Sequence, residues 1–164
     1  MQKFDIAVLP GDGIGKEIMD ACLKLLDKVQ LKVGGYALRY YLIDAGANFY
    51  VRTGVDISDA DFQICGEVDA ILFGAMGLPD VFFEDGTEVA PHLKIRDKYG
   101  LYAGVRPVKA YPNTPIMLSD KRAKDIDFVI LRESTEGMFA SRGKGEILND
   151  AIARDTMEIT RGTS

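Results

Sequence analysis

The chain opens with a short apolar run that leads directly into a glycine-rich loop, and this arrangement limits the fold more than any other stretch. The residues from Asp5 to Leu9 are aliphatic after the first, and Pro10 is followed by three glycines at positions 11, 13 and 15. An apolar run that ends in turn-forming residues predicts a buried strand entering a tight loop. We therefore expect a helix to start close to this loop.

That helix is indicated by apolar residues spaced three and four apart, which would share one helical face. They are Ile14, Ile18, Cys22, Leu25, Leu26 and Val29, and Gly34-Gly35 marks the predicted end. Further strands are predicted at 36–43, 69–73 and 127–131, with helices at 59–64, capped by Ser58, and at 91–99, ended by Gly100. Together these elements predict a layered α/β fold built from β-α-β units.

Charge and composition exclude several classes of protein. The formal net charge is −5 and the 20 basic residues form no long run, so we expect no nucleic-acid partner. The apolar stretch from Ile6 to Leu9 is too short for a signal peptide or a membrane span, so no membrane association is expected. Cys22 and Cys65 lie in apolar surroundings without a Cys-x-x-Cys pattern, which favours reduced thiols and a cytoplasmic location.

The loop LPGDGIGKE has some features of a phosphate-binding loop, because glycines after a strand let the backbone approach a phosphate. A dinucleotide fingerprint needs G-x-G-x-x-G, whereas Gly11, Gly13 and Gly15 are two residues apart. The Walker pattern also fails, since no Gly-Lys-Ser/Thr follows. The spacing favours a plain strand-to-helix turn and leaves a phosphate cradle as the alternative.

Three arginines are candidates for ligand binding because each follows or flanks a predicted buried element. Arg96 lies on the second short helix, Arg106 on an extended segment before Pro107, and Arg132 directly after an apolar strand. Guanidinium groups on rigid elements bind carboxylates in a bidentate way, so this trio suggests a clamp for a small polycarboxylate. The alternative is that each arginine is a surface residue paired with a neighbouring acid such as Asp97 or Glu133.

Other kinds of site have little support in the residues. The single histidine, His92, has no partner four residues away and the acids are scattered, so no metal site is expected within the chain. Ser134, Thr135 and Ser141 have no histidine base nearby in the sequence, which argues against a hydrolase triad.

Four motifs in order give the sequence a specific resemblance. The stretches LPGDGIGKE, ILFGAMGLP, LKIRDKYGLYAGVRPVK and VILRESTEGMFASRGKG closely resemble the isocitrate and 3-isopropylmalate dehydrogenase family, from about Phe4 to Thr163. The resemblance implies an isopropylmalate dehydrogenase-like layered α/β fold, not a Rossmann fold, in which two domains are interleaved along the chain. Residues 1–99 would then belong to the larger, cofactor-side domain, and residues 100–164 to the second domain leading into a dimer arm.

The same resemblance implies a reaction and the residues that serve it. Family members oxidise a 2-hydroxy acid with NAD or NADP and Mg²⁺ or Mn²⁺, and then release CO₂. Arg96, Arg106 and Arg132 match the arginines that bind the substrate carboxylates, and this match overrides the surface interpretation. The residues matched to the cofactor site are Ile14, Gly74, Ala75, Met76 and Gly77.

Two departures from the family pattern affect the expected activity. The family's catalytic lysine, metal-binding aspartates and most of its adenosine pocket lie beyond the equivalent of Ser164, so we expect an inactive amino-terminal part with no metal ligand of its own. Phe139 stands where the family usually has the tyrosine that helps to protonate the enol. Phenylalanine has no proton to donate, so the rate should be reduced or another group should take its place.

Substrate choice in the family depends on the helix leading to the first arginine, which here presents Val89, His92 and Leu93. The aliphatic residues favour 3-isopropylmalate, whereas the polar His92 leaves isocitrate, homoisocitrate, tartrate and malate open. The segment from Ser141 to Thr160 matches the start of the arm through which family members pair, so we expect a homodimer. Two alternatives remain: a non-catalytic or regulatory carboxylate-binding relative, and an unrelated nucleotide-binding α/β module.

Overall fold

The computed structural model describes residues 1–141 and 143–159, which divide into two compact units, Met1–Ile95 and Arg96–Ser164. The resemblance-based division at residue 99 into domains of a larger fold stays a prediction. No helix in the described part of the chain combines the length and apolar character needed to cross a bilayer.

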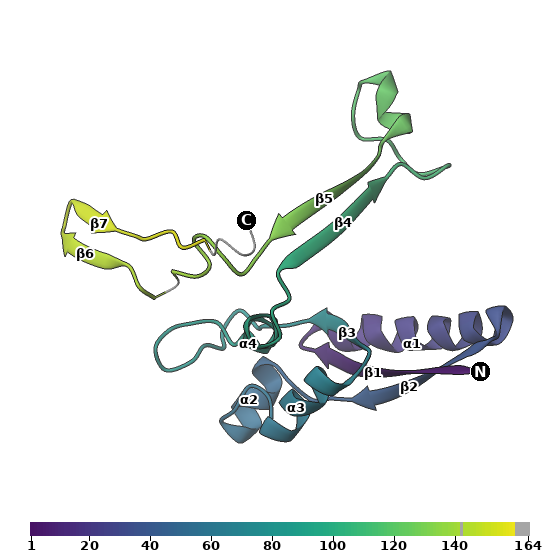
Figure 1. Cartoon of the computed structure of the whole chain (residues 1–164), viewed down its shortest axis with the longest axis horizontal. Coiled ribbons are helices and arrows are strands. Elements are labelled where there is room, and N and C mark those ends of the chain that lie inside the picture. Colours follow the sequence, from purple (N-terminus) through teal and green to yellow (C-terminus); the bar gives the residue numbers. More distant parts are fainter. Residues whose placement is uncertain (142, 160–164) are drawn as a thin grey trace. The chain divides into compact units, whose positions relative to one another are not determined.

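The first unit is a three-stranded parallel sheet with helices on both faces (Figure 1). Its strands are β1 (Gln2–Gly11), β2 (Tyr36–Leu42) and β3 (Ala70–Ala75), in the order β2-β1-β3. Its helices are α1 (Ile14–Val33), α2 (Ala47–Thr53) and α3 (Asp59–Glu67), and α4 (Pro91–Lys98) follows at the boundary of the unit. The predicted strand, loop and helix at the start of the chain are confirmed.

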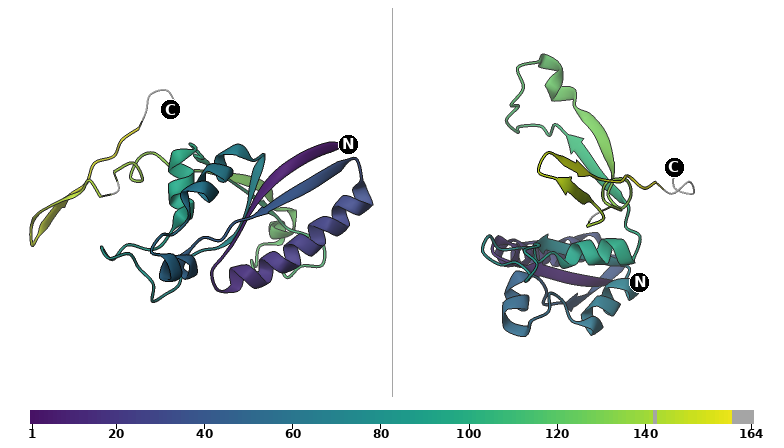
Figure 2. Two further views of the ribbon diagram at one scale, coloured as in Figure 1. Left: turned by 90° about the horizontal axis from the view of Figure 1, so that it is seen from below. Right: turned by 90° about the vertical axis from the view of Figure 1, so that its left-hand side faces the viewer.

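The strand order explains why the helices lie on opposite faces. The chain moves from β1 to β2 on one side and then crosses β1 to reach β3, and right-handed crossovers in opposite directions place their helices on opposite faces. Figures 1 and 2 show α1 along one face and α2 and α3 on the other. β1 is the central strand, and its residues Ala7, Val8 and Leu9 are fully buried.

The apolar residues predicted to share one side of α1 do so, but most of that side is exposed. The buried Gly15 and Met19 and the half-buried Cys22 and Leu26 lie along one edge of that side. The row beside them is exposed: Ile14 is 59%, Ile18 49%, Leu25 62% and Val29 39% accessible.

Local signals for helix ends are confirmed. The Ser58 hydroxyl accepts a hydrogen bond from the amide of Asp61 at 3.1 Å, which caps α3. Beyond α4, Gly100 adopts a positive φ of 61°, and the amide of Leu101 donates to the carbonyl of Arg96 at 2.9 Å. These contacts fix the start of α3 and the end of α4 close to the predicted residues, whereas α3 continues to Glu67, beyond its predicted end at residue 64.

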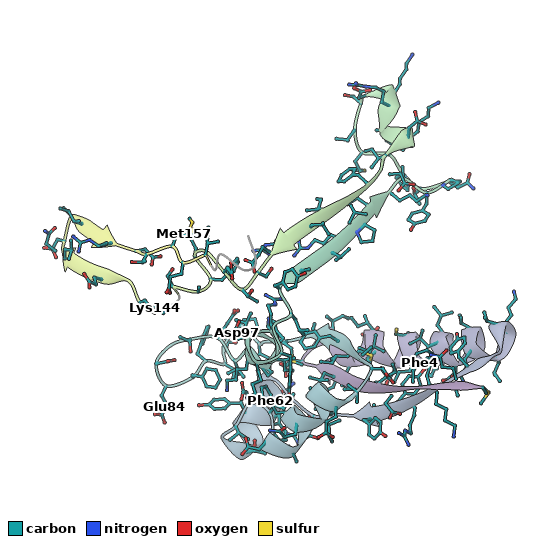
Figure 3. The ribbon with its side chains drawn as sticks, viewed as in Figure 1. Phe4, Phe62, Glu84, Asp97, Lys144 and Met157 are labelled. Atoms are coloured by element: carbon teal, nitrogen blue, oxygen red, sulfur yellow. The ribbon has the colours of Figure 1, made fainter. Side chains whose placement is uncertain are left out.

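The second unit contains two antiparallel pairs of strands and little buried apolar surface. One pair is β4 (Ala103–Lys109) with β5 (Asp127–Glu133), joined through the 3₁₀ helix η1 (Lys121–Asp125), and the other is β6 (Glu146–Asn149) with β7 (Ile152–Arg154). Side chains stand out on both faces of the β4–β5 ribbon (Figure 3). Consecutive residues Ile130 and Leu131, which point to opposite faces, are 48% and 72% exposed.

Candidate substrate and cofactor site

Two loops meet at the carboxyl end of the parallel sheet, one after β1 and one in and after β3. The amide of Asp12 donates to the carbonyl of Ala75 at 2.7 Å. A Cβ added to Gly11 would lie 1.9 Å from the Ala75 carbonyl oxygen, and one added to Gly15 or Gly74 would lie 2.2 Å from that of Pro10. These glycines are therefore needed because two backbone segments pack against each other without space for a side chain.

Three backbone amides of these loops, those of Asp12, Gly15 and Gly77, bond to the protein itself. Gly15 donates its amide to the carbonyl of Asp12 at 2.8 Å, and Gly77 donates its amide to the carboxylate of Asp12 at 2.9 Å. Amides engaged in this way are not free to hold a phosphate, and the carboxylate would repel one. The geometry therefore favours the strand-to-helix turn over the phosphate cradle.

The structure brings the predicted cofactor residues into these two neighbouring loops. Ile14 begins α1 and is 59% exposed, while Gly74, Ala75, Met76 and Gly77 form the exit of β3 and are half-buried. Gly77 has a φ of +96° with nothing within 4 Å of an added Cβ. A flat, uncharged ring could approach this open backbone, and the assignment to a cofactor stays a prediction.

Arg106 and Arg132 lie on one face of the β4–β5 ribbon. Arg106 pairs with Ile130, and Arg132 pairs with Gly104. Paired residues in an antiparallel ladder share a face, as do residues two apart in one strand, so the two arginines are diagonal neighbours about 7–8 Å apart. Gly104 stands opposite Arg132, and a Cβ added there would lie 3.1 Å from the carbonyl oxygen of Arg132 and 3.5 Å from its Cβ.

Neither of these arginines is consumed by an internal ion pair. Seven other cationic side chains of the described chain have acidic partners within 4.0 Å: Arg39, Arg52, Lys94, Lys109, Arg122, Lys144 and Arg154. No described acid pairs with Arg96, Arg106 or Arg132. The described residues therefore do not support the alternative in which each of the three arginines pairs with a neighbouring acid.

Glu133, the acid proposed as a partner for Arg132 in that alternative, is engaged elsewhere. Its carboxylate accepts hydrogen bonds from the Thr135 amide at 2.7 Å, the Thr135 hydroxyl at 2.6 Å and the Glu136 amide at 2.9 Å. The Thr135 hydroxyl is the main cause that lowers the pKa of Glu133 below its ordinary value. Glu133 therefore orders the loop after β5 and leaves Arg132 free of it.

Phe139 contacts one of the predicted substrate arginines. The guanidinium carbon of Arg132 lies 5.3 Å from the centre of the Phe139 ring, within the range of a cation–π interaction. Phe139 also lines a cavity of about 360 Å³ together with Asp97, Thr135 and Ala140. The aromatic ring thus supports Arg132, although it lacks the hydroxyl expected at this position.

The remaining predicted substrate residues lie on or before α4. Arg96 is half-buried on this helix, and Leu93 and His92 are also half-buried, with the His92 ring tilted 58° against Phe73 at 5.5 Å. Val89 precedes the helix and is 1% exposed, so in this chain it lies in the core and not on an open face. No recorded contact joins Arg96 to Arg106 or Arg132 within the described chain.

The described residues do not form a metal site. No group of three histidine, cysteine, aspartate or glutamate side chains lies close enough to hold a metal ion in the part of the chain that the structure describes. The Mg²⁺ or Mn²⁺ that the family resemblance implies therefore does not fit these residues, and we assign no step to it.

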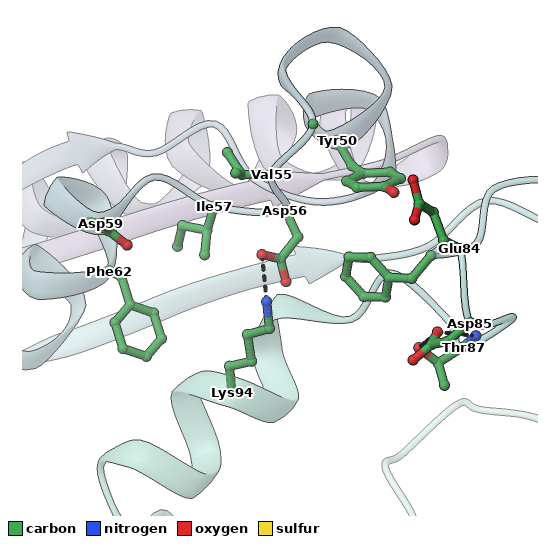
Figure 4. A pocket seen from close by; sticks show the side chains of 12 residues that line it. Tyr50, Val55, Asp56, Ile57, Asp59, Phe62, Glu84, Asp85, Thr87 and Lys94 are labelled. Carbon is green, nitrogen blue, oxygen red and sulfur yellow. Dashed lines mark hydrogen bonds and ion pairs between the residues drawn. The ribbon is translucent and has the colours of Figure 1, made fainter.

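A further cavity of about 870 Å³ in the first unit is lined by none of the predicted site residues. It surrounds an ion pair between the Lys94 amine and the Asp56 carboxylate at 2.8 Å, with Tyr50 and Glu84 on one side and Phe62 on the other (Figure 4). Asp56 is 4% exposed. Sequence reasoning missed this pair because its members are 38 residues apart and no motif links them.

Sequence comparisons place this geometry in a family. A family model described as isocitrate/isopropylmalate dehydrogenase matches residues 5–164. The chain is 36% identical over 141 residues to a tartrate dehydrogenase/decarboxylase of Pseudomonas putida, covering 85% of this chain and 38% of that protein. It is also 36% identical over 164 residues to a 3-isopropylmalate dehydrogenase of Streptomyces griseus, covering 99% of this chain and 45% of that protein.

A solved structure agrees with these relatives. The isocitrate dehydrogenase of Methylococcus capsulatus superposes with a TM-score of 0.73 at 25% identity, covering 99% of this chain and 44% of that protein. The chain thus spans less than half the length of the relatives it matches. The predicted fold class, the amino-terminal part of an isopropylmalate dehydrogenase-like layered fold, is confirmed. The chain belongs to the isocitrate/isopropylmalate dehydrogenase family.

Proposed function

We propose that the protein oxidises and decarboxylates a malate-like 2-hydroxy acid with NAD or NADP, and that this chain supplies the carboxylate clamp. The observation that carries the proposal is that Arg106 and Arg132 share one face of the β4–β5 ribbon and have no described acidic partner. Paired guanidinium groups without internal partners attract a ligand with two carboxylates.

The arginines would hold the carboxylates of the substrate in place while the hydroxyl-bearing carbon is oxidised and CO₂ is released. A guanidinium group can donate two hydrogen bonds to one carboxylate, so Arg106 and Arg132 can each bind one carboxylate of a dicarboxylic acid, with Arg96 as the third proposed group. NAD(P)⁺, when bound, accepts the hydride from the hydroxyl-bearing carbon. As the hydride leaves, the hydroxyl loses its proton and a ketone forms. The bond between the adjacent carbon and its carboxylate then breaks to release CO₂, and the resulting enol takes up a proton at that carbon.

Phe139 can stabilise this arrangement but cannot supply the last proton. Its ring lies 5.3 Å from the guanidinium carbon of Arg132 and has no ionisable group. A positioned general acid typically contributes about 10² to 10⁴ in rate. The proton for the enol would then come from water or another residue, and the reaction would be slower than with a tyrosine.

Among the candidate acids, we favour 3-isopropylmalate. Leu93 on α4 suits an aliphatic substituent, and a 3-isopropylmalate dehydrogenase is among the relatives. The half-buried His92 and the tartrate dehydrogenase relative keep tartrate, malate, isocitrate and homoisocitrate as alternatives.

The proposal is tested by kcat/KM of the intact protein for these five acids, with NAD and NADP in turn and with Mg²⁺ or Mn²⁺ present. One acid should exceed the others by at least about tenfold, since a change in one methylene or polar group is worth about 1–3 kcal/mol in a binding pocket. Absence of cofactor reduction with every acid would contradict the proposal.

Phe139 favours a second candidate, a non-catalytic relative that binds carboxylates without turnover. In that case the acids would raise the melting temperature of the intact protein while NAD and NADP stayed oxidised. Saturable binding without any reduction of the cofactor would support this candidate.

We further propose a cytoplasmic homodimer that pairs through the β6–β7 hairpin. Ile147 and Ile152 on the hairpin and Met157 after it are 86%, 53% and 62% exposed, which is unusual for a segment without a partner. The predicted arm from Ser141 to Thr160 includes Arg142 and Thr160, which lie outside the described residues. Sedimentation of the intact protein as a monomer would contradict the dimer.

A further inference from the structure

Asp12 is a buried acid without a cationic partner among the described residues. It is 1% exposed, and none of the recorded ion pairs includes it. A buried carboxylate is costly unless hydrogen bonds compensate its charge. Here the compensation comes from backbone amides, which makes the position of those amides depend on Asp12.

Three amides from two distant segments donate to this one carboxylate. Ala47 donates to Oδ2 at 2.8 Å and Asn48 to Oδ1 at 2.8 Å, both at the start of α2, and Gly77 donates to Oδ2 at 2.9 Å from the loop after β3. The donors are 35, 36 and 65 residues away from Asp12 in the chain. Asp12 thus joins the loops that follow all three strands of the sheet.

The start of α2 depends on this contact. Its N-cap residue is Gly46, which has no side chain to accept a bond from the first turn. Asp12 takes over that role from another loop, and its negative charge also suits the positive end of a helix. A Cβ on Gly46 would lie 2.3 Å from Asp12 Oδ2 and 3.0 Å from the sulfur of Met76, so the carboxylate is closely enclosed.

We propose that Asp12 is a positioning residue of the dinucleotide site. Its carboxylate holds the Gly74–Gly77 loop against the start of α2. This inference rests on the proposed function, because the loop is a cofactor site only if the protein uses NAD or NADP. Asp12 touches no substrate in this account. It acts by fixing the backbone of Gly77, where an added Cβ would meet no atom within 4 Å.

Because the carboxylate clamp is built from the other unit, loss of Asp12 should affect the cofactor and the acid differently. A loosened Gly74–Gly77 loop weakens dinucleotide binding, whereas Arg106 and Arg132 keep their places on the β4–β5 ribbon. A residue that only supports folding would instead lower the active fraction, which reduces kcat and leaves both KM values unchanged.

The test compares Asp12→Asn with Asp20→Asn in the intact protein. The asparagine keeps the shape of the side chain but turns one acceptor into an NH₂ group that faces an amide donor. We expect the Kd for NADH and the KM for NAD to rise about tenfold or more, since a hydrogen bond to a charged group contributes about 1.5–3 kcal/mol. The KM for the acid should stay within about twofold. Asp20 is exposed on α1, so its variant changes the same charge without touching the loops.

Hydrogen exchange gives a readout that does not depend on a folded variant. In the unmodified protein the amides of Ala47, Asn48 and Gly77 should exchange at least about a hundredfold more slowly than in an unstructured peptide, because opening must break bonds to a buried charge. Exchange of these amides at unstructured rates, or an Asp12→Asn variant that binds NADH as the unmodified protein does, would overturn the inference. An unmodified protein that binds no dinucleotide would mean that the proposed function itself has failed.

Discussion

The β1–β3 sheet and the β4–β5 ribbon are built from similar apolar runs, yet only the sheet buries them. Ala7, Val8 and Leu9 in β1 are 0% exposed, whereas Ile130 and Leu131 in β5 are 48% and 72% exposed. Both runs predict a strand correctly. An apolar run therefore indicates a strand that requires cover, and only the surrounding chain decides whether that cover is present.

The charged residues of the two regions differ in the same way. In the first unit Asp12 is satisfied by backbone amides, and the buried Asp56 pairs with Lys94. In the second unit Arg106 and Arg132 have no described acidic partner. We propose that carboxylates of the substrate take the place of that missing partner.

The contrast in burial is tested by two equal truncations, Leu9→Ala and Leu131→Ala. Removing Leu9 from the packed core should lower the free energy of unfolding by about 3–5 kcal/mol. Removing Leu131 should cost less than about 1 kcal/mol, because its side chain already contacts water. Chemical denaturation of the intact protein measures both.

An equal loss of unfolding free energy in both variants would contradict the difference in burial between the sheet and the ribbon. It would show that the ribbon is covered in the intact protein by residues or a partner that the described chain does not include, and that its exposure is not a property of the assembled state.

A second test separates the catalytic role of the ribbon unit from its stability. Phe139→Tyr adds a hydroxyl at the position where the family usually has one, so the rate with the preferred acid should rise about a hundredfold if that hydroxyl donates the proton. The melting temperature should change little, because the ring remains in place beside Arg132. Steady-state kinetics over a range of pH measures the rate and any new ionisation.

An unchanged rate and pH profile in the Phe139→Tyr variant would show that the hydroxyl is dispensable here. The matched change Phe4→Tyr adds a hydroxyl near the amino end of β1, at the opposite end of the strand from the glycine loop, and controls for nonspecific effects.

The sequence predicted the positions of strands and helices better than it predicted which of their faces are buried. The strands at β1, β3 and β5 followed from apolar runs, and the ends of α3 and α4 followed from Ser58 and Gly100. The split of α1 into a covered row and an exposed row did not follow, because spacing alone shows that a stripe is apolar but not how much of it a sheet can cover.

The candidate site shows the same limit. The arginines were identified from residue type and resemblance, but their common face depends on the register of β4 with β5, which turn chemistry and packing set. Asp12 was visible only as a residue between two glycines. Its three donors come from residues 35 to 65 positions away, and no local pattern indicates which amides will meet a carboxylate.

Acid should loosen the loop of the ribbon unit through Glu133. Hydrogen bonds, chiefly from the Thr135 hydroxyl, lower the pKa of Glu133, so its carboxylate stabilises the loop above the ordinary pKa of the group. That contribution is lost as the pH falls through the lowered value. Protection of the Thr135 and Glu136 amides, corrected for intrinsic exchange, should therefore decrease only once the pH is below the ordinary pKa of a glutamate, and before that of the sheet amides.

The Glu133→Gln variant provides the control, since a neutral amide does not titrate. Its loop should show low protection at every pH. A loop that remains as protected in acid as at neutral pH would show that Glu133 does not order it.

The central claim, that Arg106 and Arg132 act together on one ligand, is tested by a double-mutant cycle. The kcat/KM for the preferred acid is measured in the intact protein with Arg106→Lys, Arg132→Lys and both, with Arg122→Lys as a control for an exposed arginine that already pairs with Asp120. Two groups that bind the same molecule should show a coupling energy of about 1 kcal/mol or more, with little change in the control. Effects that add within about 0.3 kcal/mol, or an unchanged kcat/KM in both single variants, would contradict the shared clamp.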